Sequence, residues 1–164
     1  MNRRRMLTLI TAALAWLCIT VSASNAVAQD AADVAGVKAA SQAFYAALAV
    51  LDDGEAMGKV WAHTPYITFM GPGAKSILVG WDAFSKARPQ GNKLFVTRNA
   101  SGSTVDNYMH INGNVARDAV IETGQLQLKT GEVVKGDYLA TNVFEKQADG
   151  RWLMVSHHAN PKPQ

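Results

Sequence analysis

The chain has 164 residues, and 48% of them are hydrophobic, as in an ordinary globular protein. The formal net charge of +3 equals the three arginines at positions 3 to 5, so the rest of the chain is neutral and lacks the basic patch that nucleic-acid binding needs. The one cysteine, Cys18, lies in the same N-terminal stretch, which excludes disulfide and thiol chemistry from the remainder.

The first 28 residues have the features of a secretory signal peptide. The three arginines precede an apolar run from Met6 to about Val21, and Ala26-Val27-Ala28 has the A-x-A pattern of a cleavage site. We expect cleavage after Ala28, a single domain at residues 29–164, and a periplasmic or secreted protein. The run is short for a bilayer span of about 20 residues, so no stable membrane anchor is expected after cleavage. Both the general secretory route and the twin-arginine route are compatible with this leader.

Two helices are predicted next. The first covers about residues 34–51, because apolar residues recur there at helical spacing and Ser41 fills the one missing position. Asp52-Asp53-Gly54 supplies the glycine that often follows a helix end. A shorter helix is predicted from Glu55 to about Ala62. The apolar positions of the first helix are Val34, Val37, Phe44, Leu48 and Leu51.

From Tyr66 onward the period changes to two, which is typical of strands. We predict strands at 66–70 and 77–79 around a turn at 71–73, and a short helix from Trp81 to about Ala87 that ends before Pro89. After Leu94 the glycine-containing turns at 112–113, 130–131 and 149–150 predict three hairpins in sequence. Helices followed by strands, with no repeated βαβ unit, indicate an α+β fold.

Four segments carry a resemblance to a known family: Leu-Asp-Asp-Gly at 51–54, Gly-Pro-Gly at 71–73, Gly-Trp-Asp-Ala-Phe at 80–84, and Asp-Gly-Arg-Trp-Leu-Met-Val-Ser-His-His-Ala at 149–159. In this order they resemble the SnoaL-like branch of the nuclear transport factor 2-like superfamily. The resemblance implies a cystatin-like cone, in which a long N-terminal helix and two short helices pack on a strongly curved, mostly antiparallel sheet around an apolar cavity. It also implies homodimers formed through the sheet. Members include isomerases, dehydratases, cyclases and lyases without cofactors, and fold alone does not identify the reaction.

The two consecutive histidines near the C-terminus cannot both enter one cavity, because successive side chains on a strand point to opposite faces. If residues 148–150 form a three-residue loop, His158 shares a face with Asn142 and His157 faces the other way. An imidazole titrates near neutral pH, so His158 is a candidate base, with Asn142 and His157 as ligand contacts. The alternative is a strand-end histidine that only fixes the C-terminus. The predicted face of His158 comprises Tyr138, Asn142, Phe144, Met154, Ser156 and His158.

A second polar group is predicted beside the turn at 112–113. A two-residue loop there places Tyr108 opposite Arg117 and His110 opposite Val115, with Asp106 on the same face. These side chains suit a hydroxylated or acidic ligand, with Asp106 as a possible base, or else form a solvated outer face. Tyr66 and Trp61 are candidate cavity walls, and core packing is the alternative for both.

Several specific motifs are absent from the sequence. The segment GPGAKS at 71–76 lacks the glycines of a phosphate-binding loop. Neither an H-E-x-x-H motif nor a G-x-S-x-G motif occurs, so we expect no metal site and no serine hydrolase.

Two functions of different class follow from the sequence. The first is an exported, cofactor-independent enzyme that moves protons on a small apolar or aromatic ring compound, with His158, Asp137 or Asp106 as the base. Its reaction would be an isomerisation, dehydration, cyclisation or retro-aldol-type cleavage. The second is a non-catalytic ligand-binding or dimeric assembly module of the same fold. A buried acid or base with a shifted pKa would favour the enzyme.

Overall fold

The structure is a computed structural model that describes residues 31–163, apart from the side chains of residues 104, 106 and 107. The predicted signal peptide and its cleavage site lie outside the described residues. Residues from Gly36 onward form one compact unit, which is the part of the chain discussed below. Within the described residues, no helix is both long enough and apolar enough to cross a membrane.

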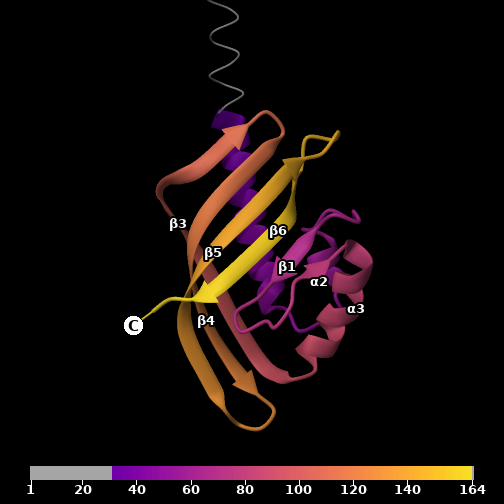
Figure 1. Cartoon of the computed structure of the whole chain (residues 1–164), viewed down its shortest axis with the longest axis vertical. Coiled ribbons are helices and arrows are strands. Elements are labelled where there is room, and N and C mark those ends of the chain that lie inside the picture. The colour runs from indigo at the N-terminus through magenta and orange to yellow at the C-terminus, as the bar shows by residue number, and fades with distance from the viewer. Residues whose placement is uncertain (1–30, 164) are drawn as a thin grey trace, which may run out of the picture. The chain divides into compact units, whose positions relative to one another are not determined.

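Six strands form one sheet in the order β2-β1-β6-β5-β4-β3. All neighbours are antiparallel except β1 and β6, which run parallel. The four long C-terminal strands build most of the sheet, and the two short strands extend it beyond β6 (Figure 1). The strands are β1 (Thr68–Met70), β2 (Leu78–Val79), β3 (Phe95–Asn112), β4 (Val115–Leu128), β5 (Val133–Lys146) and β6 (Trp152–Pro161).

The long helix is described over residues 31–49, and its part from Gly36 onward lies along one face of the sheet (Figure 1). We call this face the inner face and the opposite one the outer face. Two further helices follow, α2 (Glu55–Gly58) and α3 (Trp81–Asn92). The prediction that α3 ends before Pro89 is wrong. Pro89 lies inside α3, where its carbonyl accepts a hydrogen bond from Lys93 N at 3.3 Å, so the helix gains another turn.

The three predicted hairpins are present, and each turn contains a glycine with a positive φ angle: 59° at Gly113, 92° at Gly131 and 85° at Gly150. L-amino acids with a side chain rarely adopt this conformation. The register of the first hairpin differs from the prediction, because Asn112 pairs with Val115 and the loop consists of residues 113–114. His110 therefore lies opposite Arg117 and not opposite Val115.

The register of β6 is interrupted by a β-bulge. Phe144 pairs with Met154 and Val143 pairs with Ser156, so Val155 is an extra residue between the two pairs. An extra residue reverses the alternation of side chains along a strand. Met154 and His157 consequently lie on the same face of the sheet, although they are three positions apart in the sequence.

Aromatic rings fill the space between the long helix and the inner face. The Trp61 ring packs against Phe84 at a centroid distance of 4.7 Å and against Phe44 at 6.2 Å, and Phe69 lies 5.2 Å from Phe84. The Trp61, Phe84 and Phe44 rings belong to one buried apolar cluster with Phe144, Met154 and Ile67, and the partly buried Phe69 packs against it. The α+β class and the curved, mostly antiparallel sheet that the sequence predicts are confirmed.

The helix approaches the sheet so closely at Tyr45 that the facing residue of β3 has no room for a side chain. A Cβ atom at Gly102 would overlap the Tyr45 ring and Val120, whereas one at Gly91 in α3 would meet nothing within 4 Å. We expect Gly102→Ala to lower the free energy of unfolding by about 1–3 kcal/mol through overpacking. Gly91→Ala should be neutral or stabilising by up to about 1 kcal/mol. Urea unfolding measures both, and equal stabilities of Gly102→Ala and the wild type would contradict the packing.

Candidate active site

Polar side chains are buried together on the inner face, within an otherwise apolar interior. β4 contributes two acids, Asp118 and Glu122, which alternate with the buried Ala116 and Val120. Charged side chains are almost never fully buried unless they are paired or hydrogen-bonded, so this arrangement indicates a site. We call the following residues the buried polar cluster: Ser41, Tyr45, Asp118, Glu122, Asn142 and His157.

Strand register aligns three members of the cluster in one row. Asp118 of β4 pairs with Asn142 of β5, and Asn142 pairs with His157 of β6. The row continues into β1, where Phe69 pairs with His157 and its ring stacks on the imidazole at a centroid distance of 5.5 Å. From the other side, the Phe44 ring of the long helix lies 4.8 Å from the same imidazole. His157 is therefore enclosed between two aromatic rings and is only 1% exposed.

A chain of hydrogen bonds connects four of the six members of the cluster. Oδ1 of Asn142 lies 2.8 Å from Nδ1 of His157, and because an amide oxygen can only accept, Nδ1 carries the proton. The amide nitrogen of Asn142 donates to the Tyr45 hydroxyl at 3.3 Å, and that hydroxyl donates to Oε2 of Glu122 at 3.4 Å. The second imidazole nitrogen, Nε2 of His157, lies 3.8 Å from the same carboxyl oxygen.

The long helix supplies two hydroxyl groups to the two acids of β4. Ser41 donates to Oδ2 of Asp118 at 3.2 Å, one helical turn before Tyr45 reaches Glu122. Residues four apart in a helix lie on the same side, so both hydroxyls face the sheet. This explains why a serine occupies the apolar stripe of the helix.

The surroundings shift the pKa values of the cluster. Burial raises the pKa of Glu122 from 4.5 to about 7, and the hydrogen bond from Tyr45 opposes this only in part. Burial, aided by the nearby His158, lowers the pKa of His157 from 6.5 to about 3. Burial and the Glu122 charge also raise the pKa of the Tyr45 hydroxyl. At neutral pH, His157 and Tyr45 are uncharged and Glu122 exchanges readily between its two forms.

The charge environment of Glu122 agrees with this assignment. Among the described residues, no lysine or arginine lies within 4 Å of its carboxyl group, and its one nearby basic side chain is the neutral His157. Nothing therefore holds the carboxyl in its charged form except the Tyr45 hydrogen bond. A carboxyl with a pKa near 7 can both accept and donate a proton.

The predicted face of His158 is wrong. Because of the bulge at Val155, His157 points to the inner face with Asn142, and His158 points to the outer face opposite Thr141. Ser156 also lies on the outer face, where its hydroxyl is 2.8 Å from that of Thr68. Of the predicted face, Asn142, Phe144 and Met154 are buried on the inner side, as expected.

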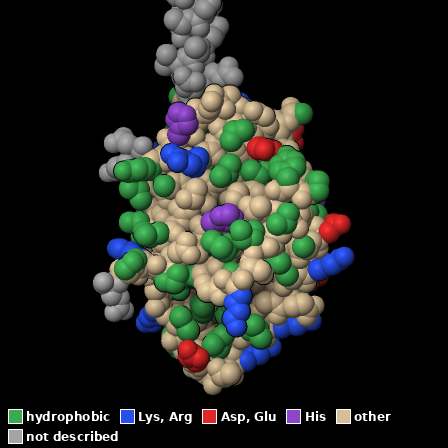
Figure 2. Space-filling model, viewed as in Figure 1, with side chains coloured by type: hydrophobic (Ala, Val, Ile, Leu, Met, Phe, Trp, Pro, Cys, Tyr) green, Lys and Arg blue, Asp and Glu red, His purple; other side chains and the backbone are tan. Residues whose placement is uncertain are grey.

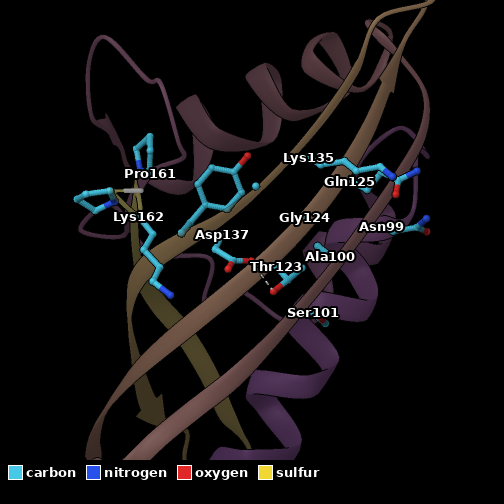
Figure 3. A pocket seen from close by; sticks show the side chains of 13 residues that line it. Asn99, Ala100, Ser101, Thr123, Gly124, Gln125, Lys135, Asp137, Pro161 and Lys162 are labelled. Carbon is cyan, nitrogen blue, oxygen red and sulfur yellow. Dashed lines mark hydrogen bonds between the residues drawn. The ribbon is translucent and has the colours of Figure 1, made fainter.

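An open groove with a volume of about 1090 Å³ lies where β3, β4 and β5 meet the C-terminal segment (Figure 3). Asp137 lies in it and accepts a hydrogen bond from Thr123 at 3.0 Å. Along their strands, Asp137 and Thr123 stand between residues that point to the inner face, so their own side chains point to the outer face. The sheet therefore separates the polar side of the groove from the buried polar cluster. The lining residues that face outward in this way are Asn99, Ser101, Thr123, Gln125, Lys135 and Asp137.

Tyr138 marks the point where this groove approaches the cluster. It lines the groove, pairs across the strands with Glu122, and is half-buried. A Cβ atom at Gly124 would meet its ring at 3.3 Å, and one at Gly136 would meet its hydroxyl at 3.2 Å, so two paired glycines provide the surface on which the side chain lies. Tyr138 is therefore a predicted ligand contact that lines the groove and pairs with a member of the cluster.

The remaining predicted site residues are not brought together. Tyr66 is 54% exposed and donates a hydrogen bond to Glu145 at 2.7 Å, whereas Trp61 is buried in the aromatic core. Tyr108 and Arg117 are exposed at the far end of the first hairpin. The side chain of Asp106 lies outside the described part of the chain. In that part, no group of three histidine, cysteine or acidic side chains is placed to hold a metal ion.

Sequence reasoning missed four members of the cluster: Ser41, Tyr45, Asp118 and Glu122. A signal for the two acids was present, because Ala116, Asp118, Val120 and Glu122 alternate at the period of a strand and put both acids on an apolar face. Ser41 was visible as the polar break in the helical stripe. Neither signal says that the helix stripe and the strand face each other.

Comparison with known proteins agrees with this architecture. The family model described as SnoaL-like domain matches residues 37–161. No curated protein sequence matches the chain. Among solved structures, a candidate calcium/calmodulin-dependent protein kinase type II association domain from Thiobacillus denitrificans is 26% identical, with a TM-score of 0.63 over 77% of this chain and 94% of the other.

Two further structures share the fold at lower identity. A candidate dehydratase of the nuclear transport factor 2-like family from Streptomyces avermitilis is 24% identical, with a TM-score of 0.68 over 82% of this chain and 99% of the other. A ketosteroid isomerase-like protein from Erwinia carotovora atroseptica is 16% identical, with a TM-score of 0.65 over 79% and 96%.

The two shifted groups should act on stability in opposite directions. Between pH 4.5 and 7 the folded protein keeps the Glu122 proton that the unfolded chain releases, so this group lowers the free energy of unfolding as pH rises. Between pH 3 and 6.5 the unfolded chain binds a proton that folded His157 does not bind, so this group raises the free energy of unfolding as pH rises. Each slope is about 1.4 kcal/mol per pH unit, and the two cancel from pH 4.5 to 6.5.

Single substitutions should therefore reveal slopes that the wild type hides. Relative to the wild type, Glu122→Gln should gain stability as pH rises from 4.5 to 6.5, and His157→Gln should lose it. Urea unfolding at several pH values measures both. Parallel pH profiles of the two variants would contradict the assignment.

Proposed function

The chain belongs to the SnoaL-like domain family, and on this basis we propose that it is an enzyme that moves a proton, without a cofactor, on a small and largely apolar ring compound bearing a carbonyl or hydroxyl group. The observation that carries the proposal is the buried Glu122 carboxyl, which has a tyrosine hydroxyl at 3.4 Å and, among the residues that the structure describes, no lysine or arginine within 4 Å. On the leader sequence we place its action in the periplasm or outside the cell.

Glu122 is the proposed catalytic residue. In its ionised form the carboxylate takes a proton from the carbon next to the substrate carbonyl, and the electron pair of the broken C–H bond moves onto the carbonyl oxygen. Returning the proton to a different carbon gives an isomerisation. Donating it instead to a hydroxyl group on the adjacent carbon, which leaves as water while the electron pair returns from the carbonyl oxygen to form the C=C bond, gives a dehydration. The raised pKa suits this work, because a base with a pKa near the working pH transfers protons most effectively.

Tyr45 is the proposed hydrogen-bond donor to the developing negative oxygen. Its oxygen receives a hydrogen bond from Asn142, which holds the hydroxyl in place before a ligand arrives. Its single proton is donated to Glu122 in the free protein and turns to the substrate oxygen once a substrate is bound. A donor held at the site of developing charge stabilises the transition state. His157 is a positioning residue, since it holds Asn142 by the 2.8 Å hydrogen bond.

Two of the solved structures with this fold are described in terms of this class of reaction, one as a candidate dehydratase and one as ketosteroid isomerase-like. They support the enzyme reading through the shared fold. The apolar walls of Phe44, Phe69 and Phe144 around the cluster favour a ring compound over a charged ligand. Every polar group of the cluster is nearly enclosed, so the proposed reaction requires an opening of the inner face that admits the substrate.

Deuterium exchange tests the proposal without knowledge of the substrate. The protein is incubated in D₂O with a panel of cyclic ketones, and ¹H NMR follows the loss of the signal from the carbon next to the carbonyl. We expect exchange above the buffer rate for at least one ketone and a loss of about a hundredfold or more in Glu122→Gln. His158→Gln is the matched control and should retain the rate, because His158 is on the outer face. Equal rates in Glu122→Gln and the wild type, or no exchange with any ketone, would contradict the proposal.

A second candidate function is assembly through the outer face of the sheet. Leu139 on that face is 48% exposed, and Figure 2 shows hydrophobic side chains spread over this view of the molecule, with most charged side chains toward its edges. The association domain described at 26% identity also favours this candidate. Both functions are compatible with one chain, since the buried polar cluster lies on the inner face.

Light scattering after size-exclusion chromatography tests the assembly. We expect a homodimer for the wild type and a monomer for Leu139→Asp, because burial of a charge at an apolar contact is costly. Ile77→Asp, at an equally exposed apolar residue beside β2, should remain dimeric. A monomeric wild type would contradict the assembly and leave the exchange experiment unaffected.

A further inference from the structure

Two arginines converge on the C-terminal end of the long helix. Nη2 of Arg88, from α3, donates to the carbonyl oxygen of Leu48 at 2.9 Å, and Nη1 of Arg98, from β3, approaches the same oxygen at 3.4 Å. Because both reach one atom, the two guanidinium groups lie side by side. Both are partly buried, so their mutual repulsion is not fully screened by water.

The positive charge at this place is only partly balanced. Among the described residues, neither arginine has a carboxylate oxygen within 4 Å. Asp52 is close enough for its charge to act on Arg88, but its two oxygens accept hydrogen bonds from the backbone N–H groups of Gly54 and Ala56 and not from the arginine. The helix C-terminus contributes only about half a negative charge.

The two guanidinium groups also have more donors than the protein uses. Each has five N–H groups, and within the described chain their acceptors are the Leu48 carbonyl and Oδ1 of Asn92, which lies 3.2 Å from Arg98. Nε of Arg88 is buried and has no hydrogen-bond partner there. A buried N–H group without an acceptor is costly, so this atom points to a missing partner.

Surrounding contacts hold the pair in place. The amide nitrogen of Asn92 donates to the Asp52 carbonyl at 2.7 Å, which fixes the oxygen that faces Arg98. The guanidinium carbon of Arg98 lies 4.2 Å from the centre of the Phe95 ring. Planar guanidinium forks match the oxygen pairs of carboxylate and phosphate groups.

We propose that Arg88 and Arg98 form a binding site for an oxyanion, the carboxylate or phosphate group of a small molecule, with Arg88 Nε as one of its donors. The site is separate from the buried polar cluster and does not depend on the proton-transfer function. An anion there would also offset the burial and the repulsion from Arg98 that lower the pKa of Arg88 to about 9.

Arginine-detected NMR tests this on the unmodified protein. Inorganic phosphate and benzoate are titrated separately at constant ionic strength, and the ¹H–¹⁵N signal of Arg88 Nε is followed. We expect the signal to shift and to saturate with at least one of the two anions, and the comparison between them distinguishes a phosphate site from a carboxylate site. No saturable shift with either anion would overturn the proposal and leave both arginines as caps of the helix C-terminus.

Substitutions provide the second readout. Arg88→Gln and Arg98→Gln should each weaken binding of the responding anion by about tenfold or more, the loss expected for a hydrogen bond between charged groups. Arg151→Gln is the matched control, because that exposed arginine is already paired with Asp149 at 2.8 Å. Should either variant fail to fold, Arg98→Lys, which keeps the charge and loses the fork, replaces it. Equal affinity in the control and the site variants would overturn the proposal.

Discussion

The hydrogen bond between Nδ1 of His157 and Oδ1 of Asn142 is the interaction on which the interior of this protein depends. It joins β5 and β6 inside an apolar core at 2.8 Å, with both side chains almost fully buried. Loss of either partner would leave a buried polar group unpaired, at a cost of about 1–3 kcal/mol. The bond also fixes the Asn142 amide, and through it the hydroxyl of Tyr45 and the carboxyl of Glu122.

This interaction exists because of one irregularity in the backbone. A regular β6 would direct Met154, Ser156 and His158 to the same face, and the outer-face bond between Ser156 and Thr68 would be lost. The extra residue Val155 reverses the alternation, so the strand buries Met154 before the bulge and His157 after it. β-Bulges are common beside active sites, where they redirect a side chain. The chemistry of the interior thus follows from a local change in strand register.

The buried polar cluster gains its reactivity from the same enclosure. Water would stabilise a charged Glu122, and its exclusion leaves a carboxyl whose neutral and ionised forms are both accessible near pH 7. The neutral imidazole at 3.8 Å contributes no positive charge that would restore an ordinary pKa. The polar groups persist in an apolar core as a hydrogen-bonded network that runs from His157 through Asn142 and Tyr45 to Glu122.

Sequence patterns predicted the helices, the three hairpins and the α+β class because glycine turns and residue spacing act locally. They did not predict the bulge, since Met154 and Val155 are both apolar and both buried, and nothing in that pair marks an extra residue. The continuation of α3 through Pro89 was also missed, because the proline by itself does not show whether the helix stops there. The residues around it decide. Asp118 and Glu122 were readable as acids on an apolar face, but their hydroxyl partners on the long helix come from a contact that no local pattern contains.

The ionisation of Glu122 in the folded protein is the most direct measure of whether this cluster is a proton-transfer site. A ¹³C NMR titration of its side-chain carboxyl, assigned by comparison with Glu122→Gln, reports that ionisation alone. We expect a midpoint near pH 7. A midpoint near the ordinary value of 4.5 would mean that water or a cation reaches the carboxyl, and it would contradict the buried base on which the proposed function rests.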